Sequence, residues 1–310
     1  MQAISTSEHD LFQLIKQRVD GNTYCQRILH GRGKYYSGLE RINIEWYPPF
    51  LFVQNFGEAL PKELANALQK IFDDLDQVEA ILIQSREWPD FVTSVFASRT
   101  ELELPQIFPA ALDDGIHCEI KLGKNRNTGV FLDMRAGWHW VKSNAQNKRV
   151  LNLFSYTGVF SLFALKGGAT RVDNVDMAAN VLKIAQKNHQ SNGLHDGCSA
   201  FYKRDILKAQ RWFESREPYD LIILDPPPYQ KKAFQGWQDY LKLLDHSRHA
   251  LAQGGTMLCC LNNPQVSIEE FKHDLSQHFG EGASLEVIER AAEIEELDNS
   301  KGLKLVAVRP

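Results

Sequence analysis

From residue 149 onward, short apolar runs alternate with segments of helical periodicity. The apolar runs predict seven strands, at 149–154, 171–176, 199–202, 219–224, 255–261, 285–291 and 303–308. Helical segments are expected at 158–165, 178–192, 206–213, 237–251 and 267–279. The unbroken apolar run 221–224 is typical of a strand buried on both faces, as a parallel sheet requires. The alternation predicts a doubly wound α/β domain that binds ligands at the carboxyl ends of its strands.

The first 115 residues follow a different pattern. Ile42, Ile44 and Trp46 alternate with polar residues and predict a half-buried strand. Pro61 predicts the start of a helix, because proline is favoured in the first helical turn. An amphipathic helix within residues 1–20 and strands at 50–54 and 80–83 complete the expected elements. We therefore expect a small α+β domain at 1–115, before the α/β domain at 116–310.

Composition narrows the class of protein. The chain has 310 residues, of which 43% are apolar and 24% charged, as in an ordinary globular protein of two domains. Its apolar runs are far shorter than the roughly 20 residues that span a bilayer, and its first residues lack the pattern of a secretory signal. Five scattered cysteines without a CxxC pair indicate a reducing compartment, so we expect a cytoplasmic protein. A monomer or a homodimer is expected. The histidines lack zinc-binding spacing, so no metal is expected.

Charge is unevenly distributed around the formal net charge of −4. Residues 1–115 contain 10 Lys+Arg and 17 Asp+Glu, whereas 116–150 is basic and 281–300 is acidic. Arg32 and Lys34 next to Tyr35-Tyr36 mix basic and aromatic residues, as surfaces that stack nucleobases do. The alternatives are a solvated loop for the basic strip and strand-edge packing for the tyrosines. Charge alone therefore neither requires nor excludes an RNA partner.

The turn after the first strand of the sheet, 152–161, contains the single glycine Gly158. It lacks the GxGxxG pattern that brings a backbone close to a pyrophosphate, so NAD and FAD are disfavoured and a cofactor without phosphates is favoured. Asp176 ends the second strand, where a carboxylate can accept both hydroxyl groups of a ribose. Asp205 follows the third strand, placed like a group that accepts from the exocyclic amine of adenine. Both aspartates also fit the simpler role of helix N-caps.

The fourth strand ends in Asp225-Pro226-Pro227-Pro228-Tyr229. Proline fixes φ and lacks an N–H group, so this loop is predicted to be rigid and extended. A rigid loop of this kind can present carbonyl groups and an aromatic ring to a planar base. The alternative is a turn that merely ends the strand.

The turn at 152–160, the two aspartates and the proline loop together resemble a class I S-adenosylmethionine-dependent methyltransferase. Asn127–Arg135 is similar to the T-G-x-F-L/Y-D-x-R pattern of one branch, the large-subunit ribosomal RNA methyltransferases I and K/L. The resemblance is strong over 116–262 and weaker over Arg27–Val53. It implies a Rossmann-like seven-stranded methyltransferase sheet preceded by a small α+β domain, with S-adenosyl-L-methionine as the cofactor. The domain at 116–310 would then bind the cofactor and carry out catalysis, and substrate recognition would be a candidate role of the domain at 1–115.

The resemblance also implies roles for individual residues. Asp176, with Met177, would bind the ribose, and Asp205, with Ile206, the adenine amine. Asp225 would lie beside the sulfonium. The remaining cofactor contacts would come from Thr128, Phe131, Asp133, Arg135, Phe154, Ser155, Tyr156, Thr157 and Gly158. The catalytic pocket for the acceptor would be formed by Asp225, Pro226, Pro227 and Tyr229.

The implied reaction is methylation of a nucleobase in ribosomal RNA, with 23S RNA as the partner. Methylation of a pyrimidine at carbon 5 needs a nucleophilic cysteine, which follows the fifth strand in the carbon-methylating branch. Here Asn262 or Asn263 occupies that place, and Cys259 and Cys260 lie within the strand as core thiols. Nitrogen methylation is therefore preferred. The alternatives are a protein or small-molecule acceptor, a catalytically silent cofactor-binding relative and, last, a nicotinamide oxidoreductase.

Overall fold

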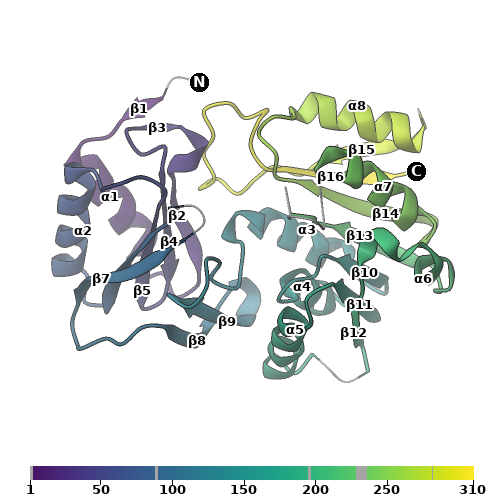
Figure 1. Cartoon of the computed structure of the whole chain (residues 1–310), viewed down its shortest axis with the longest axis horizontal. Helices are drawn as coiled ribbons and strands as arrows, with labels where there is room; N and C mark the ends of the chain where they lie inside the picture. Colours follow the sequence, from purple (N-terminus) through teal and green to yellow (C-terminus); the bar gives the residue numbers. More distant parts are fainter. Residues whose placement is uncertain (1–2, 88–89, 195–196, 228–235, 281) are drawn as a thin grey trace. The chain divides into compact units, whose positions relative to one another are not determined.

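The computed structural model describes residues 3–87, 90–194, 197–227, 236–280 and 282–310. The chain forms two compact units (Figure 1). The first contains Met1–Asp133 and Ala291–Asn299, and the second contains Met134–Arg290 and Ser300–Pro310. No helix in the described ranges is long and apolar enough to cross a bilayer.

The first unit is built around a five-stranded sheet with the strand order β2-β4-β5-β6-β7. Strands β5 and β6 run parallel, and the other neighbouring pairs are antiparallel. Strands β1 and β3 form one small sheet, and β8 and β9 form another. The elements are β1 (Ile4–Ser5), α1 (Glu8–Val19), β2 (Gln26–His30), the 3-10 turn η1 (Gly31–Gly33), β3 (Tyr36–Ser37), β4 (Ile42–Tyr47), β5 (Phe50–Asn55), α2 (Lys62–Asp74), β6 (Ala80–Ser85), β7 (Val92–Ser98), β8 (Gln106–Ala111), η2 (Asp113–Gly115), β9 (His117–Leu122) and η3 (Leu132–Met134).

Helices α1 and α2 cover one face of this sheet and form its apolar core. The helix predicted within residues 1–20 begins at Glu8, because Ser7 and Asp10 exchange the hydrogen bonds of a capping box. The buried residues that the helices and the sheet contribute to the core include Leu11, Ile15, Val19, Leu64, Leu68, Ile71, Ile42, Ile44, Trp46, Leu51, Val53 and Ile81.

Strand β4 is buried on both faces, so the prediction of a half-buried strand is wrong. All six of its residues are buried. The face away from the helices carries Asn43, Glu45 and Tyr47. Glu45 accepts hydrogen bonds from Arg27, Tyr47 and Gln54. Alternating polar and apolar positions indicate a strand, but they do not reveal that the polar side chains are paired inside the protein.

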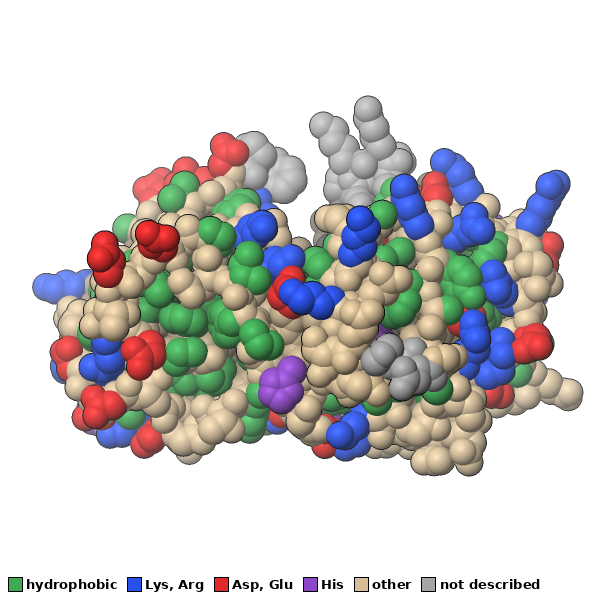
Figure 2. Space-filling model, turned by 90° about the horizontal axis from the view of Figure 1, so that it is seen from below, with side chains coloured by type: hydrophobic (Ala, Val, Ile, Leu, Met, Phe, Trp, Pro, Cys, Tyr) green, Lys and Arg blue, Asp and Glu red, His purple; other side chains and the backbone are tan. Residues whose placement is uncertain are grey.

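The second unit contains the predicted Rossmann-like sheet, with the strand order β12-β11-β10-β13-β14-β16-β15. Strands β10 to β14 pair in parallel, and β16 is antiparallel to both of its neighbours. Lys and Arg side chains are spread over the face of this unit seen in Figure 2. Its elements are α3 (Arg135–Asn144), β10 (Arg149–Leu153), α4 (Val159–Lys166), β11 (Arg171–Asp176), α5 (Ala179–Ser191), β12 (Ser199–Lys203), η4 (Ile206–Lys208), α6 (Gln210–Glu214), β13 (Tyr219–Leu224), α7 (Trp237–Arg248), β14 (Leu251–Leu261), α8 (Ile268–Phe279), β15 (Ser284–Val287) and β16 (Lys304–Arg309).

The sequence pattern missed several elements, among them α3 and the strands β7, β8 and β9. Strand β7 lies at the edge of its sheet and leaves Val92 68% exposed, so its apolar residues do not mark a buried face. Strands β8 and β9 are defined by pairing with each other, which periodicity does not report. The helix predicted at 206–213 is divided into η4 and α6.

The division into units falls later in the chain than residue 115. Residues 116–133 stay with the first unit because several contacts hold them there. The Cys25 N–H donates to the Ala111 carbonyl at 2.7 Å, at the end of β8, beside the turn that leads into β9. Further on, the Thr128 and Tyr47 hydroxyl groups lie 2.7 Å apart. These tertiary contacts join the predicted segment before the sheet to the first unit.

Part of the acidic run packs against the first unit. Residues 291–299, between β15 and β16, return to the first unit, and we call them the acidic strap. Glu295 forms an ion pair with Arg18 at 2.5 Å and accepts from the Tyr36 hydroxyl at 2.8 Å. The Leu297 N–H donates to the Gly33 carbonyl at 2.8 Å. The strap therefore gives Tyr36, which is 3% exposed, a buried structural role, so a base-stacking role for this tyrosine is wrong.

Replacing Gly33 with alanine is expected to destabilise the protein by about 1–3 kcal/mol, as overpacking does. A Cβ atom at this position would lie 2.0 Å from the Glu295 carbonyl oxygen, so η1 or the acidic strap must move. Urea unfolding measures the loss. Gly282→Ala is the matched control, because its Cβ would meet nothing within 4 Å. Equal stability of the two variants would contradict close packing of the strap on η1.

Candidate functional site

The structure brings together the strand ends on which the sequence places the cofactor. Because β11, β10 and β13 are adjacent and parallel, Leu153 is in register with Val175 on one side and with Leu224 on the other. The residues that follow these positions are Phe154, Asp176 and Asp225, which therefore share one edge of the sheet. Strand β12 ends beside β11, and the Arg204 N–H donates to the Asp176 carbonyl at 3.0 Å. Asp205 follows directly.

The turn between β10 and α4 has a strained backbone. Phe154 (φ 57°) and Tyr156 (φ 46°) adopt the left-handed conformation that side chains disfavour, and Gly158 (φ 82°) adopts it as well. Each such non-glycine residue costs of the order of 1–3 kcal/mol and persists only where the surroundings impose it. One contact that holds the turn in this conformation is the hydrogen bond from the Ser155 N–H to the Val175 carbonyl at 3.1 Å. Strain of this kind is concentrated at ligand-binding sites.

Asp176 connects this turn to the next helix. One carboxylate oxygen accepts from the Tyr156 N–H at 3.1 Å, and the other accepts from the Ala178 N–H at 2.8 Å. Burial raises the pKa of Asp176, although hydrogen bonds from backbone N–H groups act in the opposite direction. A carboxylate has about four acceptor positions, so capacity remains for hydroxyl groups of a ligand. Asp176 therefore orders the turn and can bind a ribose as well.

Asp205 and its neighbours lie at the end of β12. Asp205 occupies the N-cap position of η4, but its side chain makes no capping hydrogen bond, so the helix-cap alternative does not account for its carboxylate. The carboxylate pairs instead with Lys208 at 3.0 Å. Ile206 is buried at 4% exposure, whereas Met177 is 39% exposed. Ile206 and Met177 offer apolar surface that suits an adenine ring, and the Asp205 carboxylate suits the adenine amine.

Asp225 and Pro227 are half-buried after β13, and Pro226 is buried. Pro228 and Tyr229 lie outside the described residues. On the next strand, Cys259 and Cys260 are fully buried, and burial raises the pKa of Cys259 to about 12. Asn262 is exposed just after this strand, and the Asn263 side chain accepts from the Gln265 N–H at 2.9 Å.

The predicted segment before the sheet is divided between the units. Thr128, Phe131 and Asp133 belong to the first unit, and Arg135 begins α3 in the second. Thr128 is buried against Tyr47, whereas Phe131 is 44% exposed. Thr128 thus has a structural contact that sequence reasoning did not anticipate, and its predicted contact with the cofactor stays a prediction.

Sequence reasoning missed three buried polar side chains beneath the strained turn. Asn152 of β10 donates to the Ser161 hydroxyl of α4 at 2.8 Å, and Ser161 donates to Asn174 of β11. All three are at most 1% exposed. These bonds tie the start of α4 to both strands. The signal was present in the sequence as two asparagines that fall in register within otherwise apolar parallel strands.

The residues present fit the cofactor that the resemblance implies. The Ser155 hydroxyl is buried in the turn and has no hydrogen-bond partner among the described residues, so a polar ligand group would satisfy it. A Cβ atom at Gly158 would lie 3.0 Å from His189, so the turn has no room for a side chain there. Acceptors at Asp176 and Asp205 match a ribose and an amine. The described residues contain no group of three or more His, Cys, Asp or Glu side chains suited to a metal ion.

Comparisons with known proteins identify the family. A family model of S-adenosylmethionine-dependent methyltransferases matches residues 26–309. Over 234 residues, 71% of this chain and 57% of the relative, the chain is 32% identical to the ribosomal RNA large subunit methyltransferase I of Aeromonas salmonicida. It is 35% identical over 162 residues to the ribosomal RNA large subunit methyltransferase K/L of Pseudoalteromonas translucida, covering 50% of this chain and 23% of that one.

Both relatives are longer than this protein, which spans little more than half of the first. Among solved structures, SMU.776 complexed with SAH matches 100% of this chain and 83% of its own, with a TM-score of 0.82 and 22% identity. The two proteins therefore share a fold across both units.

Proposed function

Because the chain belongs to the family of S-adenosylmethionine-dependent methyltransferases, we propose that it methylates a nucleobase nitrogen of large-subunit ribosomal RNA. The similarity to ribosomal RNA methyltransferases I and K/L is the observation that supports RNA as the methyl acceptor. Because this chain spans only 57% of the first relative, its own acceptor has to be tested directly.

In this proposal the strand ends of the second unit hold the cofactor. Asp176 accepts the ribose hydroxyl groups, Asp205 accepts the adenine amine, and the unsatisfied Ser155 hydroxyl bonds a polar group nearby. When bound, the cofactor supplies an electrophilic methyl group on a sulfonium. Hydrogen bonds within the protein already hold the strained turn, so little ordering is expected when the ligand binds.

The loop after β13 is proposed to hold the acceptor base. Methyl transfer depends mainly on positioning, since a nitrogen lone pair directed at the methyl group suffices. Pro226 and Pro227 have no N–H group, so the backbone there offers only carbonyl acceptors to a base amine. Asp225, half-buried just after the buried strand β13, would accept a proton from the methylated nitrogen.

The cysteines support nitrogen over carbon 5. Carbon-5 methylation needs a reactive thiolate, and all five cysteines are described. Cys25, Cys118, Cys259 and Cys260 are buried, and burial raises the pKa of each. Cys198 immediately precedes β12, at the amino end of the strand and away from the proposed site. All five are free thiols, which also supports the cytoplasm as the proposed location.

Transfer of labelled methyl from S-adenosylmethionine tests the proposal. RNA from a strain that lacks this gene is compared with RNA from the parent strain and with protein and small molecules from the same lysate. We expect label in the deletion-strain RNA alone, and nucleoside digestion should yield an N-methylated base. Label in protein or a metabolite would overturn the RNA acceptor while retaining the cofactor. A 5-methylpyrimidine would overturn the nitrogen preference.

A further inference from the structure

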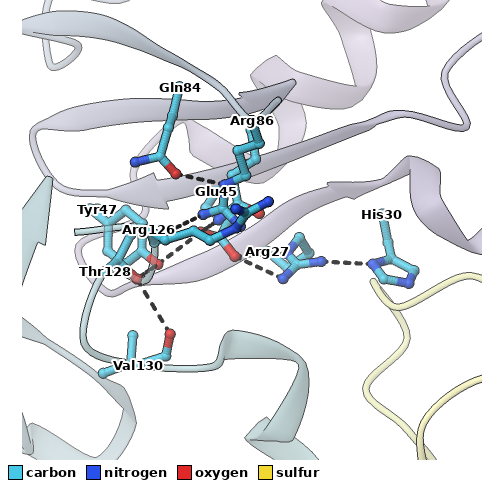
Figure 3. Close-up of polar contacts among 10 residues, drawn as sticks. Arg27, His30, Glu45, Tyr47, Gln84, Arg86, Arg126, Thr128 and Val130 are labelled. Atoms are coloured by element: carbon cyan, nitrogen blue, oxygen red, sulfur yellow. Dashed lines mark hydrogen bonds and ion pairs between the residues drawn. The ribbon is translucent and has the colours of Figure 1, made fainter. Parts of the chain in front are cut away.

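On the polar face of the sheet in the first unit, several arginines lie around the Glu45 carboxylate, both oxygens of which already accept hydrogen bonds. Figure 3 shows Arg27, Arg86 and Arg126 near Glu45. Arg27 pairs with one Glu45 oxygen at 2.8 Å, and Tyr47 and Gln54 donate to the other at 2.9 and 2.8 Å. Glu45 therefore forms its ion pair with Arg27, and its second oxygen is occupied by the hydrogen bonds from Tyr47 and Gln54.

Two arginines beside this network have no carboxylate partner among the residues that the structure describes. Arg86 directs Nε to the Gln84 side chain at 2.6 Å and Nη2 to the Arg126 carbonyl, both of which are neutral acceptors. Arg32, in η1, is exposed. Within the described ranges, neither guanidinium has an Asp or Glu at ion-pair distance. Each keeps N–H donors available.

Phe56 brings these two cations together. The Arg32 guanidinium lies 4.4 Å from the centre of the Phe56 ring, and the Arg86 guanidinium lies 5.2 Å from it. Cation–π contacts of this length are attractive. Two positive groups are thus held on one aromatic ring despite their mutual repulsion.

Burial and neighbouring arginines act on the pKa of both guanidinium groups. Burial lowers the pKa of Arg86 to about 10, and the charges of Arg126 and Arg32 lower it as well, although Glu45 opposes them. Although the Arg32 side chain is exposed overall, its partial desolvation lowers the pKa of its guanidinium, and the charge of Arg27 contributes, whereas Asp133 and Glu296 act in the opposite direction. Both remain cationic at neutral pH, so a bound anion would relieve the repulsion.

The Gly31-Arg32-Gly33 turn presents Arg32 on a rigid support. A Cβ atom at Gly31 would lie 2.0 Å from the Leu39 carbonyl, and one at Gly33 would lie 2.0 Å from the Glu295 carbonyl. Both glycines are buried, while the arginine between them is exposed. The motif therefore fixes the position of one charged side chain.

We propose that Arg32 and Arg86, positioned by Phe56, bind one phosphodiester group of the RNA acceptor, an inference that rests on the proposed function. Guanidinium groups match phosphate oxygens with paired, charge-assisted hydrogen bonds. S-adenosylmethionine has no phosphate, so the phosphate belongs to the acceptor. The first unit then contributes directly to substrate binding.

Salt-dependent binding of a single-stranded ribosomal RNA fragment tests this site. Arg32→Gln should weaken binding about tenfold and reduce the slope of log K against log salt by about 0.7, the contribution of one phosphate contact on a single strand. Affinity for S-adenosylmethionine should not change. Lys62→Gln is the matched control, because it removes the same charge at the start of α2, on the helix-covered side of the sheet.

A second variant isolates the positioning role of Phe56. Phe56→Leu keeps every charge, so a reduced salt slope with an unchanged unfolding midpoint would report loss of guanidinium position. If wild-type protein methylates RNA but Arg32→Gln matches Lys62→Gln in affinity and slope, the phosphate site is overturned and the proposed function stands. If wild-type protein neither binds nor methylates RNA, the proposed function fails and this site fails with it.

Discussion

Replacing Asp176 with alanine is expected to lower the affinity for S-adenosylmethionine by about ten- to a hundredfold, equivalent to roughly 1.5–3 kcal/mol for hydrogen bonds to a charged group. Two effects add. The variant loses the acceptor for the ribose hydroxyl groups, and it releases the Tyr156 and Ala178 N–H groups that hold the turn. Isothermal titration with S-adenosylmethionine and S-adenosylhomocysteine measures the loss.

The pH dependence gives this prediction a second readout. Only the ionised carboxylate is a pure acceptor, so cofactor affinity should fall as pH drops through the raised pKa of Asp176. Stability responds in the opposite direction. Because folding raises this pKa, the folded state favours the protonated form, and the stability penalty from this group disappears as pH falls through the same range. Loss of binding there is therefore not caused by unfolding at this residue.

Asp220→Ala is the control for Asp176. Asp220 also accepts a backbone N–H, that of Arg149 at 2.8 Å, but it lies at the amino end of β13. Its removal should leave cofactor affinity unchanged. Equal affinities of Asp176→Ala and wild type would show that the ribose is bound elsewhere.

Replacing Glu45 with glutamine is expected to cost about 3–5 kcal/mol of stability, because it leaves a buried guanidinium without its counter-charge. Glu45 and Arg27 are only 2% and 6% exposed. The loss would be concentrated in the first unit, where Arg32, Arg86 and Arg126 add further positive charge. Denaturant unfolding of the full chain, with midpoints and slopes compared, measures it.

A double variant separates charge from packing. Arg27→Met combined with Glu45→Leu should be more stable than Glu45→Gln alone, since no isolated charge is left in the interior. The exposed pair of Lys16 and Asp74, 2.6 Å apart, is the control, and Asp74→Ala should have a far smaller effect. If Glu45→Gln is as stable as wild type, the buried pair does not hold this face of the sheet.

Much of the second unit could be predicted from the sequence because its signals are local. All seven strands were expected from apolar runs, and the five strands β10 to β14 pair in parallel, as a doubly wound sheet requires. Asp176 and Asp225 were expected at strand ends, where the structure has them. Parallel pairing brings these residues, which are far apart in the sequence, to one edge of the sheet. The position of the candidate site could therefore be predicted from the sequence.

The first unit was less predictable because its polar residues are buried in pairs. Glu45 and Tyr47 follow the alternation of an exposed strand face, yet their partners come from Arg27, Gln54 and Thr128, up to 81 residues away. The acidic strap was interpreted as part of a charged run, and its ion pair with Arg18 spans 277 residues.

The sequence by itself determined the type of each main element and the chemistry at the strand ends, since periodicity, prolines and aspartates act over a few residues. The tertiary structure alone decided which charges are compensated. Arg27 has a buried carboxylate, whereas Arg32 and Arg86 share an aromatic ring and have none among the described residues. The burial of a charged side chain and its ion pairs depend on chain segments that meet only after folding. Both determine how strongly that charge interacts with its surroundings.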